Sequence, residues 1–190
     1  MIRAIIFDCY GVLVGRGFPA AYAEAGGDLK RDEGFLHHML DAVSLGKFSS
    51  EEFHQEIADR IGISVGEWLE VYKDVMLPNE KLFDYIRTEL KGKYKIGLLS
   101  NANHGSVEEK LTQEQLGLFD VRVISADVGM IKPDPKIYQL AAERLDVDTN
   151  ECVFTDDNEL YVTAAKEQGM QAFLYHDLAG FKDQLKTTLA

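Results

Sequence analysis

The chain has 190 residues, 46% hydrophobic and 27% charged, which suits a compact globular protein with its own core and argues against intrinsic disorder. Its formal net charge is −12 and no basic run offsets it, so a nucleic-acid partner is not expected. No long apolar span or cationic leader pattern is visible, so we expect a cytoplasmic protein with no membrane partner. The spacing of Cys9 and Cys152 does not suit zinc, and both fall in apolar stretches, so reduced core cysteines are expected.

The first element is an apolar, β-forming run over residues 2–7. It ends abruptly in Asp8, and Gly11 follows soon after. This pattern predicts a buried strand that delivers one carboxylate to a tight turn. Asp8 is therefore the candidate nucleophile.

The next stretch, residues 18–76, is predicted to be helical throughout. Its apolar residues recur at helical spacing in three segments: 35–43, 53–61 and 65–76. Ser49 with Glu52, and Ser64 with Glu67, match the capping-box pattern at the starts of the second and third segments. We expect a small bundle of helices here.

After Pro78 the chain alternates between helices and short apolar strands. The expected strands are 94–99, 121–126, 151–155 and 171–175. The expected helices are 80–91, one that ends near 116, 135–145, 159–169 and a terminal helix, the third of them started by Asp134 and Pro135. Such alternation predicts an α/β fold in three layers, with a doubly wound parallel sheet covered by helices on both faces.

Polar side chains follow three of the expected strands at the point where each strand ends. These residues are Asp8, Ser100, Asn101, Asp156 and Asp157. Ligands of parallel sheets bind beyond the carboxyl ends of the strands, so we expect these side chains to gather there. The adjacent acids at 156 and 157 repel each other unless a cation compensates, and Mg²⁺ is the usual hard cation for carboxylates.

A lysine in an unusual setting precedes the helix at 135–145. Pro133 holds Lys132 extended, and Asp134 with Pro135 fixes the start of the helix, so the ammonium group is aimed rather than free. A lysine placed in this way can neutralise a phosphate and the carboxylate of a nucleophile together. The alternative is a surface lysine before a helix.

These four segments, in this order, resemble the four motifs of the haloacid dehalogenase superfamily. The segments are Asp8-Cys9-Tyr10-Gly11-Val12-Leu13, Ser100-Asn101, Lys132-Pro133-Asp134-Pro135 and Asp156-Asp157. The resemblance implies a Rossmann-like core from residues 1–15 and 79–190. It also implies that 16–78 form a small α-helical cap domain inserted after the first strand.

The resemblance further implies a reaction and a set of roles. Asp8 would attack phosphorus and form an aspartyl-phosphate on a small phosphorylated metabolite. The implied catalytic residues are Asp8, Tyr10, Ser100, Asn101 and Lys132, of which the last three also bind substrate. The implied ligands of Mg²⁺ are Asp8, the backbone carbonyl of Tyr10, Asp157 and, through water or by orienting Lys132, Asp156.

Tyr10 departs from the usual pattern, because most phosphatases of the superfamily carry a second Asp there as acid and base. Tyrosine, with an ordinary pKa near about 10, is a poor base at neutral pH, so a phosphatase of this sequence is predicted to be slow. The Asp-x-Tyr-Gly form is similar to that of the L-2-haloacid dehalogenases, which need no metal and lack the paired acids. Three readings therefore stand: a magnesium-dependent phosphomonoesterase, a 2-haloacid dehalogenase, and a catalytically impaired homologue that binds a phosphorylated ligand.

Two further features bear on the site. Tyr161 stands where related acidic motifs often carry Asn. A proton donor on the cap, such as Tyr22, His37 or His38, is one way around Tyr10, although solvated or core positions are expected for all three. His54 is expected to be a surface residue.

Overall fold

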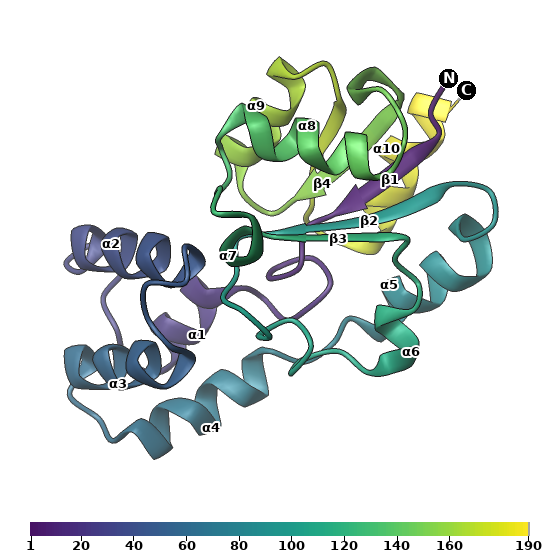
Figure 1. Cartoon of the computed structure of the whole chain (residues 1–190). Coiled ribbons are helices and arrows are strands. Elements are labelled where there is room, and N and C mark those ends of the chain that lie inside the picture. Colours follow the sequence, from purple (N-terminus) through teal and green to yellow (C-terminus); the bar gives the residue numbers. More distant parts are fainter. Residues whose placement is uncertain (190) are drawn as a thin grey trace.

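The computed structural model describes residues 1–189 and contains a five-stranded sheet in which every neighbouring pair of strands is parallel (Figure 1). The strands are β1 (Ala4–Phe7), β2 (Lys95–Ser100), β3 (Val121–Ile124), β4 (Cys152–Asp156) and β5 (Gln171–Leu174). Their order is β3-β2-β1-β4-β5, so the chain winds outward in both directions from β1. This confirms the predicted doubly wound sheet and puts its switch point at the end of β1.

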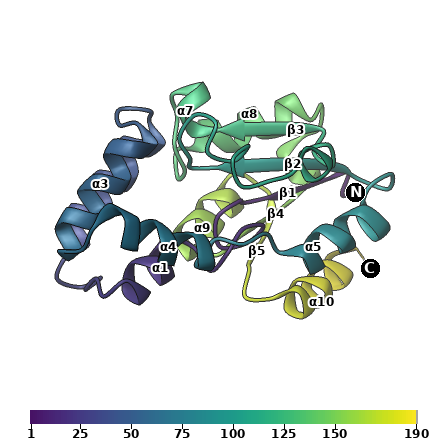
Figure 2. The same cartoon turned by 90° about the horizontal axis from the view of Figure 1, so that it is seen from below.

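Successive residues of β1 bury opposite faces of the sheet. Ala4 and Ile6 belong to a core shared with α8 and α9, whereas Ile5 and Phe7 belong to a core shared with α5 and α10. The helices that cover the sheet are α8 (Pro135–Arg144), α9 (Glu159–Glu167), α5 (Glu80–Tyr85) with its π-helical extension η1 (Ile86–Leu90), and α10 (Leu178–Leu189). Figure 2 shows α5 beside α10, where Tyr85 and Phe181 meet edge to face. A strand covered on both faces has every side chain buried, which explains its unbroken apolar sequence.

Four helices form a separate group beyond the carboxyl end of β1 (Figure 1). They are α1 (Phe18–Glu24), α2 (Glu33–Ser44), α3 (Ser50–Ile61) and α4 (Val65–Val75). Both predicted capping boxes are confirmed: Ser49 and Glu52 close the start of α3, and Ser64 and Glu67 close that of α4. The apolar faces of these helices join the same buried cluster that covers one face of the sheet.

Two paired connections join this group of helices to the sheet. The backbone N–H of Gly15 donates to the carbonyl of Leu77 at 2.8 Å, and that of Asn79 donates to the carbonyl of Leu13 at 2.8 Å. Gly15 has a φ of +61°, and a Cβ there would come within 2.4 Å of the carbonyl oxygen of Val75. Only glycine fits this close approach without strain.

Two sequence predictions on the far side of β2 were wrong. Residues 101–112 form turns rather than a long helix, and α6 (Gln113–Leu116) is a single turn started by the capping box of Thr112 and Gln115. The strand predicted to reach 126 ends at Ile124, because Ser125 begins the short helix α7 (Ser125–Val128). The Ser125 hydroxyl accepts a hydrogen bond from the N–H of Ala102 at 2.9 Å and so fixes the turns to α7.

Two further observations concern residues 1–189. Cys9 and Cys152 are buried and form no disulfide, as predicted. No helix in this part of the chain is both long and apolar enough to span a bilayer.

Candidate active site

Three carboxylates meet at the edge of the sheet where β1 and β4 end. One oxygen from each of Asp8, Asp156 and Asp157 lies within 4.8 Å of the others. Their proximity follows from the parallel pairing of β1 with β4, in which Phe7 lies opposite Thr155. Asp8 and Asp156 are buried, and Asp157 is the exposed member of the group. Parallel strands that end in acids predict this meeting of side chains.

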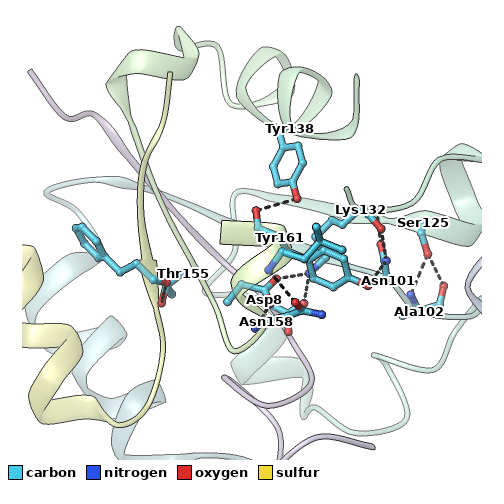
Figure 3. A network of polar contacts seen from close by, with 12 residues as sticks. Asp8, Asn101, Ala102, Ser125, Lys132, Tyr138, Thr155, Asn158 and Tyr161 are labelled. Carbon is cyan, nitrogen blue, oxygen red and sulfur yellow. Dashed lines mark hydrogen bonds and ion pairs between the residues drawn. The ribbon is translucent and has the colours of Figure 1, made fainter. Parts of the chain in front are cut away.

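Lys132 reaches into this group from the loop before α8 (Figure 3). Its Nζ donates to Oδ1 of Asp8 at 2.6 Å and to Oδ2 of Asp156 at 2.5 Å, and its side chain is only 1% exposed. The sequence alternative of a surface lysine is therefore wrong. A buried ammonium between two carboxylates satisfies their charge and fixes their positions.

Asn101 holds the backbone of Lys132 rather than its side chain. The N–H of Lys132 donates to Oδ1 of Asn101 at 2.7 Å, and Nδ2 of Asn101 donates to the carbonyl of Lys132 at 2.9 Å. This reciprocal pair ties the end of β2 to the lysine loop. Asn101 also forms part of the cavity wall over the carboxylates.

Two aromatic rings flank the ammonium group of Lys132. Its Nζ lies 4.9 Å from the ring centre of Tyr161 and 5.6 Å from that of Phe154. The hydroxyl of Tyr138 donates to the backbone carbonyl of Tyr161 at 3.0 Å (Figure 3). A cation over an aromatic face is attracted by the ring quadrupole. Tyr161, the departure noted in the sequence, therefore acts on the lysine, which sequence reasoning missed.

The charges in this group are out of balance. Three carboxylates against one ammonium leave two negative charges when all four groups are ionised. Burial raises the pKa of Asp8 to about 8, although Lys132 lowers it, and burial together with Asp156 raises the pKa of Asp157 to about 6. For Lys132, burial lowers the pKa, but Asp156 and Asp8 outweigh it, so the pKa lies above the ordinary lysine value.

The donor set fits a small divalent cation. Carboxylate oxygens are the ligands that Mg²⁺ prefers, and a charge of +2 offsets the two unbalanced negative charges. Asp157 presses against the backbone of Gly11, where a Cβ would come within 2.1 Å of Oδ2. Gly11 has a φ of +99°, so glycine both allows the turn after Asp8 and leaves room for the carboxylate of Asp157.

Ser100, at the end of β2, has a buried hydroxyl whose hydrogen-bonding capacity is unmet. Its residue is 1% exposed, and among residues 1–189 its Oγ is the buried side-chain polar atom that has no hydrogen-bond partner. Unsatisfied buried hydroxyls are rare in native proteins, because the lost hydration costs free energy. A ligand oxygen near the end of β2 would satisfy it.

The Tyr10 hydroxyl binds the backbone rather than a carboxylate. It donates to the backbone carbonyl of Ser106 at 3.1 Å, within the turns that follow β2. Burial raises the pKa of Tyr10 well above its ordinary value. The hydroxyl proton is thus engaged by the backbone, and the ring is poorly suited to act as a base near neutral pH.

A cavity of about 370 Å³ opens over the carboxylates and Lys132. Its walls include Tyr10 and Asn101 from the core, and Phe18 and Leu40 from α1 and α2. A second cavity of about 140 Å³ adjoins it between the helices and the turns after β2. The two cavities share Tyr10, Phe18, Leu40, Ser44 and Asn101.

The second cavity corrects the sequence expectation for His54. This residue is half-buried on α3 and lines the cavity, and Nε1 of Trp68 donates to its Nδ1 at 2.9 Å. Tyr22, by contrast, is a core residue as expected, and its hydroxyl donates to the buried Asp32 at 2.7 Å. Sequence periodicity places His54 on α3 but gives no sign of the partner on α4.

Comparison with known proteins gives relatives of several activities. The chain is 26% identical to a D-ribitol-5-phosphate phosphatase of Bacteroides thetaiotaomicron, covering 100% of this chain and 99% of the relative. It is 25% identical to an (S)-2-haloacid dehalogenase of Pseudomonas putida, covering 97% and 88%. It is also 28% identical to the bifunctional epoxide hydrolase 2 of Sus scrofa, covering 93% of this chain but spanning only 37% of that protein.

Solved structures share the fold. A haloacid dehalogenase family enzyme of Bacteroides thetaiotaomicron, crystallised with magnesium and inorganic phosphate, has a TM-score of 0.70 at 22% identity over 95% of this chain and 99% of that one. A predicted hydrolase of Porphyromonas gingivalis has a TM-score of 0.72 at 23% identity over 100% and 98%. The family model described as haloacid dehalogenase-like hydrolase matches residues 2–169. With the doubly wound sheet and the acids and lysine at its edge, this match shows that the chain belongs to the haloacid dehalogenase-like hydrolase family.

Proposed function

We propose that this hydrolase is a magnesium-dependent phosphomonoesterase that acts on a small phosphorylated metabolite. The observation that carries the proposal is the group of Asp8, Asp156 and Asp157 around Lys132, in which two negative charges need a cation. Phosphoryl transfer uses such a site, because a cation and a lysine together neutralise the charge of the transferred group. The full-length phosphatase relative adds support.

In the proposed reaction, the carboxylate of Asp8 attacks phosphorus, the bond to the ester oxygen breaks, and the alcohol leaves with a proton from water. Water then hydrolyses the aspartyl-phosphate, which releases phosphate and restores Asp8. Lys132 and the unpartnered hydroxyl of Ser100 stabilise the phosphoryl oxygens. Magnesium, held by Asp8, Asp157, the carbonyl of Tyr10 and Asp156, would supply further positive charge there.

We propose that α1 to α4, residues 16–78, act as a cap over this site. Phe18 of α1 and Leu40 of α2 lie in the wall of the cavity above the carboxylates, which supports the proposal. A cap of this kind excludes water and contacts the leaving group, so it bears on which substrates are accepted.

A second candidate is a 2-haloacid dehalogenase. In that reaction Asp8 displaces halide from carbon, and water hydrolyses the resulting ester, so no acid for the leaving group is needed. Tyr10 favours this reading, and haloacid dehalogenases are among the relatives. The paired acids weigh against it, because without a cation their burial and repulsion raise the pKa of Asp8 and Asp157.

The test is phosphate release from 4-nitrophenyl phosphate with and without Mg²⁺, beside halide release from 2-chloropropionate. We expect Mg²⁺-dependent phosphate release that falls by at least about 10³-fold in Asp8→Asn. Metal-independent halide release would make the protein a dehalogenase. If wild type and Asp8→Asn behaved alike in both assays, a homologue that only binds phosphorylated ligands would remain.

A further inference from the structure

The wall of the second cavity includes residues from α3, α4 and the turns after β2. One of them is a lysine that the proposed reaction does not use. Lys110 is half-buried in the cavity wall, and its Nζ lies 4.8 Å from the ring centre of Tyr72. Within residues 1–189, no carboxylate forms an ion pair with this ammonium group. Glu109 also lines the cavity but is exposed and forms no such pair. A half-buried ammonium without a partner is available to an anion.

His54 adds a second polar group in the same wall. Because its Nδ1 accepts the hydrogen bond from Trp68, the neutral ring carries its proton on Nε2, a donor with no partner among the described residues. Burial, and then the charge of Lys110, lowers the pKa of His54 to about 4, so the ring is neutral at pH 7. The cavity wall thus holds one half-buried cation, one neutral donor and the exposed carboxylate of Glu109.

One part of the cavity wall is apolar, and the cavity has the size of one aromatic ring. Phe18, Phe53 and Met76 line it beside Tyr72. Its volume is about 140 Å³, and an apolar protein cavity of about 150 Å³ accommodates benzene. Flat apolar walls of this kind suit an aromatic or similarly compact group.

The second cavity opens beside the site of the chemistry. Tyr10, Phe18 and Asn101 belong to its wall and also to the wall of the cavity over Asp8. A phosphate ester bound at Asp8 would therefore place its leaving group toward the ring-sized cavity. The net charge of −12 would repel an anionic group elsewhere, so the unpaired Lys110 is the feature that would hold it.

We infer that the substrate is a phosphomonoester whose compact apolar leaving group carries a carboxylate, and that Lys110 determines this specificity. The inference rests on the proposed phosphatase function, which it narrows to a substrate class. Lys110 contacts the far end of the substrate and takes no part in bond breaking. Its removal should therefore change selection among esters and leave the chemistry of simple esters unchanged.

The experiment compares the phosphate esters of 4-hydroxyphenylacetate and 4-hydroxyphenylacetamide. The methylene group separates the ring from the charge, so the two phenols leave with similar ease. We expect wild-type kcat/KM to favour the carboxylate ester by about tenfold, as charged hydrogen bonds do. Lys110→Gln should lower kcat/KM for the carboxylate ester to that of the amide ester and leave the amide ester unchanged.

A matched control is Lys182→Gln on α10. Nζ of Lys182 lies 4.3 Å from the ring centre of Tyr85, so this variant removes the same charge and the same kind of contact outside both cavities. It should leave the preference for the carboxylate intact. Equal kcat/KM for the two esters in wild type, unaffected by Lys110→Gln, would overturn the inference while the phosphatase function stands.

A binding measurement tests the carboxylate site independently of the hydrolysis reaction. Saturation-transfer NMR should detect phenylacetate on wild type and on Lys182→Gln, and about tenfold more weakly on Lys110→Gln. If neither ester is hydrolysed but this pattern holds, the proposed phosphatase function fails and the carboxylate site in the cavity stands. Equal binding of phenylacetate to all three proteins would overturn the carboxylate site itself.

Discussion

Lys132 is the residue on which the charge balance of the candidate active site depends. Its Nζ is within hydrogen-bond distance of Asp8 and Asp156, and its side chain is almost fully buried. Removal of one member of a buried ion pair leaves the other charges uncompensated, which costs more than the intact arrangement contributes.

We therefore predict that Lys132→Met lowers the free energy of unfolding by about 3 kcal/mol in metal-free buffer. Urea denaturation followed by circular dichroism measures the change. Lys136→Met, an exposed lysine on the next helix, should shift the free energy by less than about 0.5 kcal/mol. Equal effects of the two substitutions would show that the buried contacts of Lys132 contribute no more to the free energy of unfolding than those of an exposed lysine.

Substitution of Tyr10 tests the role of this residue in the proposed reaction. Its hydroxyl is bound to a backbone carbonyl, so Tyr10→Phe should leave phosphate release within about twofold of wild type. Tyr10→Asp would supply the missing acid and base, which contributes about 10²- to 10⁴-fold in general acid–base catalysis. For an alkyl phosphate, whose leaving group needs a proton, we expect at least about a tenfold gain in kcat.

The aryl ester supplies the control for this prediction. Its phenol leaves without protonation, so Tyr10→Asp should change its turnover far less than that of the alkyl ester. A similar change for both esters would mean that Tyr10→Asp acts through the shape of the cavity and not through proton transfer.

At the scale of elements, the contact between α3 and α4 links stability to pH. His54 on α3 accepts from Trp68 on α4, and burial lowers its pKa from 6.5 to about 4. The unfolded chain thus takes up the proton at a higher pH than the folded one. The stabilising contribution is complete above about pH 6.5 and is lost as the pH falls toward 4.

We predict that wild type loses about 1 kcal/mol more free energy of unfolding than His54→Gln between pH 7 and 4, after allowance for solvent near the half-buried ring. Urea denaturation across this pH range measures the difference. His37→Gln removes an exposed histidine of α2 and should follow the wild-type pH dependence. If His54→Gln also shows the wild-type pH dependence, protonation of His54 does not affect the free energy of unfolding.

The elements that the sequence predicts well are those whose signals are local. Ser49 and Ser64 each find their capping partner three residues away, so the pattern alone places the starts of α3 and α4. Residues 101–112 do not form the helix that the sequence predicts, because their conformation depends on distant partners. Ser125 accepts from Ala102, and Asn103 donates to the carbonyl of Phe48. The pattern of residues within the segment gives no indication of these contacts.

The same distinction applies to the candidate site. Strand ends predict that Asp8, Asp156 and Asp157 meet, because parallel pairing brings the ends of β1 and β4 together. The rings around Lys132 and the cavity beside Tyr72 depend on how helices pack over that edge. Such packing joins residues far apart in the chain, so only the three-dimensional structure shows it.

At the scale of the whole molecule, a cation at the sheet edge would couple to global stability. A ligand that binds only the folded state at 100 times its Kd stabilises it by about 2.7 kcal/mol. For a chain of this length we predict a rise in Tm of about 5 to 10 °C with saturating Mg²⁺. Differential scanning calorimetry with Mg²⁺ and with EDTA measures it.

A pair of variants makes this prediction specific. Asp157→Asn should remove most of the Mg²⁺-dependent rise in Tm, because it takes one carboxylate from the group. Asp183→Asn, on the exposed side of α10, should keep the full rise. No rise in wild type, or an equal rise in both variants, would contradict a magnesium site at these acids.

The position of Tyr10 in the walls of both cavities has an evolutionary consequence. In the proposed reaction, this one side chain bounds the space for the leaving group and stands where the sequence resemblance implies the acid and base of a phosphatase. A lineage that exchanged Tyr10 for an acid would alter the rate of leaving-group protonation and the space for the leaving group in a single step. Selection cannot adjust these two traits independently at this position, so compensating changes are expected among its neighbours on α1 and α2.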